Sequence, residues 1–511
     1  MGLGSLEYLK NMKRSWKTAF CSTFFLGLLV HMYKFTNTLL NHDSVFSYYT
    51  DLNIIGSGRW FLSTACGITS YFDLPWIIGI VSLVFLGLTA VLVVDIFEIE
   101  NPVLILLTGG ILAAFPGVTQ TFFFEFTADG YMLAVFLSAL AVWLTRIETN
   151  KNTIYIFARW ALAAVCLCLS CGIYQAQVSF GMVLALCYLL YELLEKRHDD
   201  KTYWRWAFQQ LVLYAVALAA YYLIWQICMK VQGVQPSDYK GISGAGLSLR
   251  SLLSAVPEVF KALGRFFLEW NVLEMGWTLY GVMNVAFLAA FALSILGAVC
   301  RAGLWRNRGR MALFAVAAAL IPFATCVWML VSPGMDYNPM MLISLSVLYI
   351  FAAVLFERYF AELWKNLMGL FLAAMVFVFS LQANVSYFFM QRTYQTSCAT
   401  GTELLTRIHM LEQPTRKMYV IGNLYAQVEL KNAAYAEHIP LLGYALERDL
   451  LFDFEHTVLF LNNTFNTNFW CIKPEDRLRL DAMEAVQNMP CWPAPDSVKL
   501  IEDIIVIKLS E

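Results

Sequence analysis

The run WIIGIVSLVFLGLTAVLVV occupies residues 76–94 and contains no charged side chain. It is long enough to cross the hydrocarbon core of a bilayer as an α-helix, which takes about 20 residues. A helix is expected because lipid offers no hydrogen-bond partners, so the backbone must satisfy its own. Apolar runs of this kind begin near Ala19, Trp76, Pro102, Tyr131, Trp160, Val178, Phe208, Trp277, Met311, Met340 and Leu367. The sequence therefore predicts a mainly α-helical, polytopic membrane protein with about 11 transmembrane helices.

The composition of the whole chain agrees with a membrane protein. Hydrophobic residues make up 59% and charged residues 14% of the 511 residues, against about 45–50% and about 25% in soluble proteins. With a net charge of −2, the chain lacks the basic field that binding to nucleic-acid phosphates needs. We therefore expect the lipid bilayer as a partner and exclude nucleic acid.

Lys and Arg are distributed unevenly over the loops between the predicted spans. With the N-terminus in the cytoplasm, most of them fall in cytoplasmic segments, for example Lys10 to Lys17, Lys196 to Arg205 and Arg301 to Arg310. The loops on the other side carry Lys34, Arg59, Lys230, Lys240, Arg250, Lys261 and Arg265. Because positive charge favours the cytoplasmic side, we expect an inside N-terminus, an odd number of spans and an extracytoplasmic C-terminus.

After about residue 390 the apolar runs shorten and charged residues become frequent. We therefore divide the chain into a transmembrane part, 1–390, and a soluble extracytoplasmic domain, 391–511. Local patterns in this domain predict a small α/β unit, with strands at 417–421, 457–461 and 504–509 and helices at 401–411 and 475–487. Its histidines lack ligand spacing and are expected at the surface or in the core. They are His409, His438 and His456.

The cysteines indicate packing rather than chemistry in the transmembrane part. Cys166, Cys168 and Cys171 have the spacing of a metal cluster, but they lie within a span without histidine or charge and are expected to pack as small apolar residues. In the C-terminal domain the sequence leaves the pairing of cysteines undecided. A disulfide between two of them requires that this domain lie in an oxidising compartment. That domain holds Cys398, Cys471 and Cys491.

A second outer element is predicted between residues 248 and 270. Apolar residues recur there at helical spacing, while Arg250, Glu258 and Lys261 share the opposite face. This pattern is typical of an amphipathic helix on a membrane surface, and Pro257 should kink it. Such a helix either guides a lipid headgroup or shields the spans.

Several polar residues of the predicted outer side are candidates for one site. They are Asp43, Arg59, Glu125, Asp129, Tyr174, Gln175 and Asp336. They come from different loops, and we expect the loop from 34 to 75 to be the catalytic one. Ionisable groups at one membrane face either converge on a functional site or are ordinary solvated loop ends.

Four short motifs follow one another on this face. They are His42-Asp43-Ser44, Gly58-Arg59-Trp60, Phe126 to Tyr131 with Asp129, and Ile173-Tyr174-Gln175-Ala176. In order, spacing and common face they resemble the bacterial glucosyltransferase family of O-antigen serotype-converting enzymes. The resemblance spans most of the membrane part, and the small α/β unit after the last span also looks like that family.

This resemblance implies a GT-C type membrane glycosyltransferase. Such enzymes take a hexose from a polyprenyl-phosphate donor and pass it to a cell-surface glycan at the outer face of the bacterial cytoplasmic (inner) membrane. The family's usual donor is undecaprenyl-phosphate glucose, and its acceptor is the O-antigen of lipopolysaccharide in the cell envelope. We therefore expect polysaccharide modification by a glucosyltransferase.

The resemblance also assigns roles to the first outer loop. Asp43 is expected to be the general base that takes the acceptor hydroxyl proton, a role that contributes about 10²- to 10⁴-fold. The alternative is that Asp43 only caps the helix that begins near Ser44. Arg59 is expected to hold the donor phosphate through paired guanidinium donors. Its alternative is an interfacial arginine beside Trp60 whose charge reaches up to water.

The remaining candidates are expected to bind substrate. Glu125 and Asp129 share a face if the segment is helical, so they either orient sugar hydroxyls or, together with Asp43, hold a divalent ion such as Mg²⁺ or Mn²⁺. The alternative for Asp129 is the N-cap of the fourth span. Tyr174 and Gln175 either bind sugar or satisfy backbone groups of a tight turn. Asp336 follows Pro333 and Gly334, which mark a turn first.

Two other classes of protein stay open. A transporter of lipid-linked glycans or solutes is one alternative, but the sequence has no internal repeat, no pair of broken helices and few charges near mid-bilayer, which mark many transporters. A non-catalytic scaffold or sensor is the other. Replacing Asp43 with asparagine distinguishes an enzyme from these two classes. An enzyme should lose sugar transfer but stay folded, whereas a scaffold should be unaffected.

Overall fold

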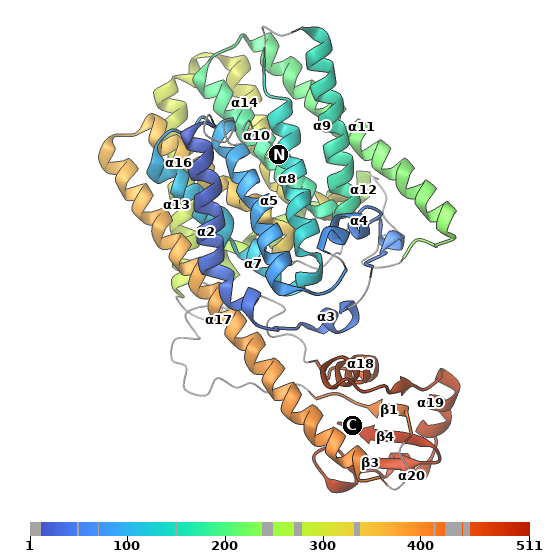
Figure 1. Cartoon of the computed structure of the whole chain (residues 1–511). Helices are drawn as coiled ribbons and strands as arrows, with labels where there is room; N and C mark the ends of the chain where they lie inside the picture. Colours follow the sequence, from blue (N-terminus) through green and yellow to red (C-terminus); the bar gives the residue numbers. More distant parts are fainter. Residues whose placement is uncertain are drawn as a thin grey trace, which may run out of the picture.

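The computed structural model describes residues 12–48, 51–69, 71–148, 152–237, 249–269, 278–331, 338–411, 415–424, 442 and 450–511. Long helices lie side by side in a bundle, and a small sheet with its own helices lies beyond one end of it (Figure 1). We call this small part the sheet unit; it comprises residues 415–424 and 450–511. The predicted class, a polytopic helical protein with a small C-terminal α/β part, is confirmed.

Ten helical stretches in the described ranges are long and apolar enough to cross a membrane. One of them, Pro102–Leu144, turns back on itself. At its start, Asn101 donates a hydrogen bond to Glu357. Just beyond its end, Arg146 donates to Asp95. Both contacts lie at the same end of the bundle. The stretch therefore runs away from that end of the bundle and returns to it, whereas the sequence predicts two separate spans there.

The returning stretch consists of α6 (Pro102–Ala114), α7 (Pro116–Thr121), the 3₁₀ turn η3 (Phe122–Thr127) and α8 (Ala128–Leu144). The other long helices are α2 (Arg14–Thr36), α5 (Pro75–Ile96), α9 (Thr153–Ile173), α10 (Val178–Glu195), α11 (Asp200–Gln232), α13 (Leu279–Ala302), α14 (Arg308–Thr325), α16 (Ser346–Tyr359) and α17 (Glu362–His409). The short turn η4 (Gln175–Gln177) separates α9 from α10, so these are two spans, as predicted.

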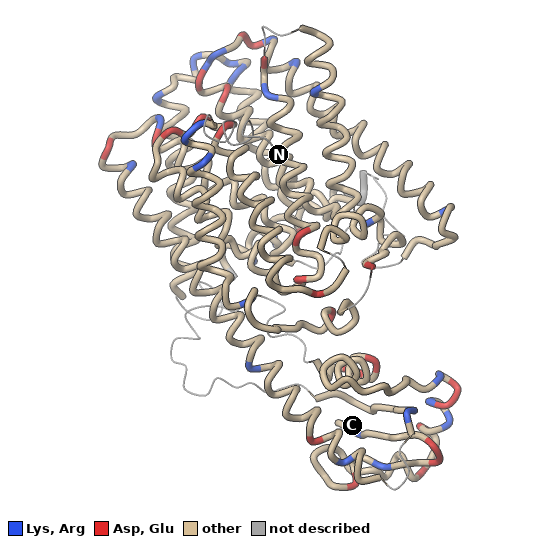
Figure 2. The backbone as a smooth tube through the Cα atoms, viewed as in Figure 1, with Lys and Arg blue, Asp and Glu red and all other residues tan. Residues whose placement is uncertain are grey.

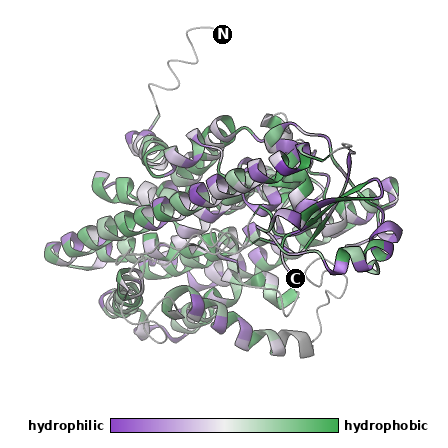
Figure 3. Ribbon diagram, turned by 90° about the horizontal axis from the view of Figure 1, so that it is seen from below, coloured by the Kyte–Doolittle hydropathy of each residue, from purple (hydrophilic) through white to green (hydrophobic). Residues whose placement is uncertain are grey.

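Apolar residues fill the interior of the bundle and also occupy much of its exposed outer surface. The span containing α16 is entirely buried inside the protein, whereas only 17% of the α11 window is buried. On α11, Leu211, Leu223 and Ile227 are exposed, and hydrophobic residues make up much of the long helices (Figure 3). Exposed apolar surface of this extent is what a helix facing lipid presents.

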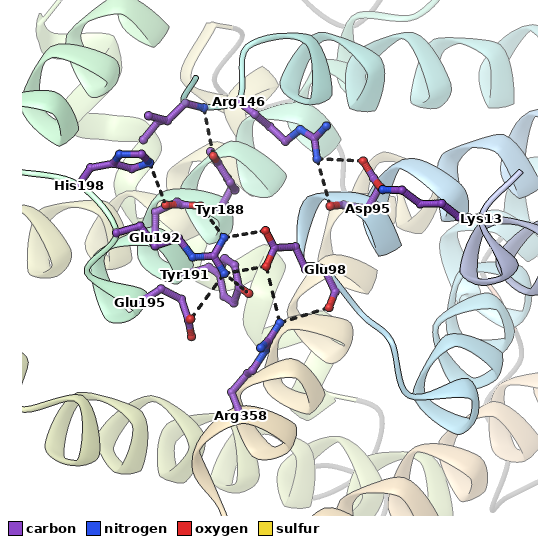
Figure 4. Close-up of polar contacts among 12 residues, drawn as sticks. Lys13, Asp95, Glu98, Arg146, Tyr188, Tyr191, Glu192, Glu195, His198 and Arg358 are labelled. Carbon is purple, nitrogen blue, oxygen red and sulfur yellow. Dashed lines mark hydrogen bonds and ion pairs between the residues drawn. The ribbon is translucent and has the colours of Figure 1, made fainter. Parts of the chain in front are cut away.

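Charged residues gather at the end of the bundle opposite the sheet unit (Figure 2). We call it the basic end; it carries Lys13, Arg146 and Arg358 (Figure 4), and also Arg197, which pairs with Glu98. Asp95 accepts from Lys13 Nζ at 2.8 Å and from Arg146 Nη1 at 2.9 Å. Both guanidinium Nη atoms of Arg197 lie 2.6 Å from the carboxylate of Glu98, and this bidentate pair lowers the pKa of Glu98.

The loop between α2 and α5 lies at the other end, facing the sheet unit (Figure 1). It is built from short helices: α3 (His42–Ser47), η1 (Ile55–Ser57), α4 (Leu62–Cys66) and η2 (Gly67–Thr69). Asp43 therefore lies in a short helix, and Arg59 follows shortly after the end of η1.

A helix occupies the predicted amphipathic segment. It comprises α12 (Leu249–Gly264) and a π-helical turn, η6 (Arg265–Glu269), and it contains Pro257. Its face with Ala255, Val259 and Ala262 is buried, whereas Leu253 and Phe260 are exposed. The buried face packs against α14 and α15 (Val327–Val331). The predicted ends, 248 and 270, lie outside the described residues.

The sheet unit has four strands in the order β2-β1-β4-β3. The strands are β1 (Lys417–Ile421), β2 (Trp470–Cys471), β3 (Val498–Ile501) and β4 (Ile504–Lys508). β1 pairs in parallel with β2 and β4, while β3 and β4 form an antiparallel pair. The strands predicted at 417–421 and 504–509 are confirmed, and the short strands β2 and β3 were not predicted.

Other predictions for this part need correction. Residues 457–461 are not a strand but the middle of helix α18 (Phe454–Phe465), which begins where Asp453 Oδ1 accepts from His456 N at 2.8 Å. The helix predicted at 475–487 is two helices, α19 (Pro474–Asp481) and α20 (Glu484–Gln487). The helix predicted at 401–411 is confirmed as the last part of α17, which runs unbroken through 390 and 391 to His409. The three cysteines considered for a disulfide are free thiols: Cys398, Cys471 and Cys491.

Candidate active site

Helix α3 presents Asp43 near the junction of bundle and sheet unit. Asn41 caps this helix, because its Oδ1 accepts from Ser44 N at 2.8 Å while Ser44 Oγ accepts from Asn41 N at 3.3 Å. The interpretation of Asp43 as the cap is therefore wrong. The Asp43 side chain is 49% exposed, and its Oδ1 lies 3.4 Å from His42 Nε2. The Asp43 carboxylate is therefore half exposed and does not cap α3.

Arg59 follows a turn that is tied to α11 and to the α9–α10 connection. Tyr221 Oη donates to Gly58 O at 3.1 Å, and Gln175 Nε2 donates to Ser57 O at 2.8 Å. Trp225 Nε1 donates to Ile55 O at 2.8 Å. The turn residue Gly58 has φ +83°, a left-handed conformation that favours glycine. Gln175 thus holds the backbone of the turn before Arg59.

The Arg59 guanidinium lies over an aromatic stack. Its Cζ is 4.9 Å from the ring centroid of Tyr174, and Tyr174 stacks on Tyr131 with centroids 4.3 Å apart. A cation over the face of a tyrosine is attracted by the ring quadrupole. Arg59 is therefore oriented by Tyr174, and the two tyrosines are buried partners of each other.

Replacing Gly58 with alanine is expected to destabilise this turn. The left-handed backbone costs a non-glycine residue about 1–2 kcal/mol, and the added Cβ would run into the hydroxyl of Tyr221 and the amide of Gln175. The melting temperature in detergent should fall measurably. Gly233→Ala is the matched control, because Gly233 has φ +65° but nothing lies within 4 Å of its added Cβ. Equal losses in both variants would contradict the steric part of this prediction.

Asp129 is buried in the first turn of α8. Only 1% of it is exposed, and its Oδ2 accepts from Thr69 Oγ1 at 2.7 Å. Thr127, not Asp129, holds the N-cap position of α8, so the capping interpretation is wrong. The Thr69 contact ties the end of the first outer loop to the bundle.

Glu125 forms a buried ion pair that the sequence did not reveal. Its partner is Lys34 at the end of α2, and both side chains are 2% exposed. Lys34 Nζ also donates to Leu39 O at 2.9 Å. Asp73 interacts electrostatically with both members of the pair, and burial raises the pKa of Asp73. A buried lysine requires a carboxylate nearby, but the sequence alone does not say which one.

The structure places the predicted site residues in two groups, of which the first comprises Asp43 on α3 and Glu125 on η3, two elements that are in contact. Phe124, next to Glu125, lies with its ring centroid 6.3 Å from that of His42, next to Asp43. Arg59, Tyr174 and Gln175 form the second group. Asp336 lies outside the described residues.

Glu125 and Asp129 bind different partners, Lys34 of α2 and Thr69 of η2. Across the described ranges, no three side chains among His, Cys, Asp and Glu are grouped so that they could hold a metal ion. The divalent-ion role considered for Asp43, Glu125 and Asp129 therefore has no ligand set there.

Two cavities, of about 240 and 190 Å³, lie at the basic end. Glu98 and Arg358 line the larger one, and Asn101, Leu104 and Glu357 line both. Neither cavity adjoins Asp43 or Arg59, so neither belongs to this candidate site.

A family model described as glucosyl transferase GtrII matches residues 32–356. Those residues are well over half of the chain and include both groups of site residues. Searches of curated proteins and of solved structures find no match. The chain therefore belongs to the glucosyl transferase GtrII family and is a glycosyltransferase with many membrane-spanning helices.

Proposed function

We propose that this protein moves a hexose, expected to be glucose, from a polyprenyl-phosphate donor to a cell-surface glycan. The observation that carries the proposal is the family match over residues 32–356, since it includes the half-exposed Asp43 and the oriented Arg59 at the same end of the bundle. An enzyme acting on a lipid-linked sugar needs a base and a phosphate-binding cation where the chain leaves the bilayer. Undecaprenyl phosphate as carrier and O-antigen as acceptor are parts of this proposal.

The orientation belongs to the same proposal. The basic end holds Lys13, Arg146 and Arg358 (Figure 4) and Arg197 beside Glu98, and positive loops favour the cytoplasm. With that end inside, Asp43, Arg59 and the sheet unit face outward from the bacterial inner membrane. The transmembrane transferase then comprises residues 1–390 and the extracytoplasmic domain residues 391–511.

The proposed reaction is a displacement at the anomeric carbon. Asp43 takes the proton of an acceptor hydroxyl, and the hydroxyl oxygen forms a bond to the anomeric carbon. The bond between that carbon and the phosphate oxygen breaks, and its electron pair leaves with the polyprenyl phosphate. Arg59 stabilises the departing anion with its guanidinium. One direct displacement would invert the anomeric centre.

The other residues support this arrangement in different ways. Tyr174 and Gln175 hold Arg59 and its turn, Asp129 holds the end of the loop through Thr69, and Glu125 holds α2 through Lys34. Sugar contacts by these side chains and by Asp336 stay predictions.

An assay in oriented membrane vesicles tests the proposal. Vesicles containing the protein receive a panel of polyprenyl-phosphate hexoses and a water-soluble glycan that cannot cross the membrane. We expect donor breakdown and glycan labelling with polyprenyl-phosphate glucose, and only in vesicles whose outer face is the cell's outer face. A transporter would leave every donor intact, and labelling only in inverted vesicles would refute the orientation.

A further inference from the structure

The side chain of His42 lies where three parts of the chain meet. On its own helix, Nε2 is 3.4 Å from Asp43 Oδ1. On the bundle side, its ring centroid is 6.3 Å from that of Phe124 in η3. On the sheet-unit side, its ring is 6.3 Å from those of Phe452 and His456. His42 is buried, so the position of the Asp43 helix depends on both the bundle and the sheet unit.

Helix α18 of the sheet unit packs directly against α3 (Figure 1). Asn463 Nδ2 donates to Val45 O at 2.9 Å, and the rings of Phe46 and His456 meet edge to face with centroids 4.4 Å apart. An apolar cluster lies around these contacts. Its buried members are Leu40, Val45, Leu450, Leu451 and Phe460.

These contacts supply what α3 lacks by itself. α3 has only six residues, and helices this short are unstable without tertiary packing. The last carbonyls of a helix have no partner within it, and Val45 O is one of them. Asn463 satisfies this carbonyl from outside. The sheet unit therefore fixes both the fold of α3 and the direction in which Asp43 points.

His456 is itself held rigidly in α18. Its Nδ1 is 2.8 Å from Asp453 Oδ1, and its ring centroid is 4.5 Å from that of Phe452. Within the described ranges its Nε2 is buried without a hydrogen-bond partner. The ring therefore contributes to the contact with α3 by its shape.

We propose that the sheet unit is a positioning element of the transferase, in which His456 and Asn463 of α18 fix α3 and thereby aim Asp43 at the acceptor. This inference rests on the proposed function, in which Asp43 is the base. It assigns the sheet unit a part in the chemical step, although no residue of α18 contacts the reacting atoms. His456 and Asn463 are positioning residues in this sense.

The first test replaces His456 in the full-length protein. His456→Ala removes the ring against Phe46 and is expected to lower kcat about 10- to 100-fold, because small misplacements of a catalytic group are costly. The KM for the polyprenyl-phosphate donor should not change, since Arg59 is held by other contacts. His456→Phe keeps an aromatic ring and should restore kcat to near wild type. His409→Ala is the matched control, since His409 is exposed near the end of α17.

The second test does not depend on activity. Asn463→Asp replaces the donor to Val45 O with a carboxylate, so hydrogen exchange of the α3 amides should become faster by at least tenfold. Asn488→Asp, an exposed position elsewhere in the sheet unit, should leave this exchange unchanged. If His456→Ala fails to fold, the kcat and exchange of Asn463→Asp decide the question.

The two proposals fail in different ways. If His456→Ala and Asn463→Asp keep wild-type kcat and wild-type exchange in α3 while Asp43→Asn is inactive, the positioning role is wrong and the proposed function stands. If the wild-type protein cleaves no donor, the proposed function is wrong. A loss of kcat that His456→Phe does not restore would also overturn the role assigned to the ring.

Discussion

Asp43→Asn is expected to lower the rate of sugar transfer about 10²- to 10⁴-fold, the range that a general base contributes. The amide has nearly the shape of the carboxylate but cannot take the acceptor's proton. The fold should survive, because Asn41 caps α3 and the Asp43 side chain is half exposed. Transfer is measured with polyprenyl-phosphate glucose and the soluble glycan, and folding by the melting temperature in detergent.

Asp51→Asn is the matched control for this substitution. Asp51 lies in the same loop and is exposed, and its Oδ1 accepts from Asn53 N at 3.2 Å, which asparagine can still do. This variant should transfer sugar at the wild-type rate. Asp43→Asn with undiminished transfer would exclude Asp43 as the base and would fit a transporter or a scaffold better than an enzyme.

Lys34→Met is expected to cost about 3–5 kcal/mol of folding stability, the usual effect of removing one partner of a buried ion pair. The loss arises because Glu125 would remain buried without its cation. Adding Glu125→Gln removes the second charge, so the double variant should recover most of the stability. Recovery of this kind is expected because the desolvation cost of the charges disappears with them.

The measurement is denaturant or thermal unfolding of the purified protein in detergent. Lys230→Met is the control, because Lys230 is exposed in the last turn of α11 and should tolerate the change. A single variant as stable as wild type would show that the Lys34–Glu125 pair is not structurally important. A double variant no more stable than the single one would show that the loss comes from packing rather than from charge.

The sequence was sufficient to predict the bundle because each span forms its backbone hydrogen bonds within itself. Each span is therefore recognisable from the length and composition of a single apolar run. It was insufficient in the sheet unit, where residues 457–461 are a short apolar run that fits a strand or a buried helix equally well. Asp453, which begins α18, and the packing of α18 on α3 decide for the helix. Tertiary contacts of this kind leave no periodic pattern.

For a related reason, the sequence predicted the loops of the candidate site but not the partners of its polar side chains. The motifs around Asp43 and Arg59 indicate which loops matter, but not which polar groups find partners inside the protein. Lys34 pairs with Glu125 across 91 positions of the chain, so no local pattern could connect them. The cap by Asn41 was recognisable in principle, since Asn is a favoured N-cap residue.

Helix α17 has a geometric consequence for the whole protein. Its 48 residues span about 70 Å at about 1.5 Å per residue, more than twice the thickness of the hydrocarbon core at about 30 Å. The helix therefore extends well beyond the bundle. Its length and direction set the distance and the orientation of the sheet unit, and so of α18, relative to α3. A single residue inserted into α17 would rotate everything beyond it by about 100° around the helix axis, so it should disrupt the packing of α18 on α3.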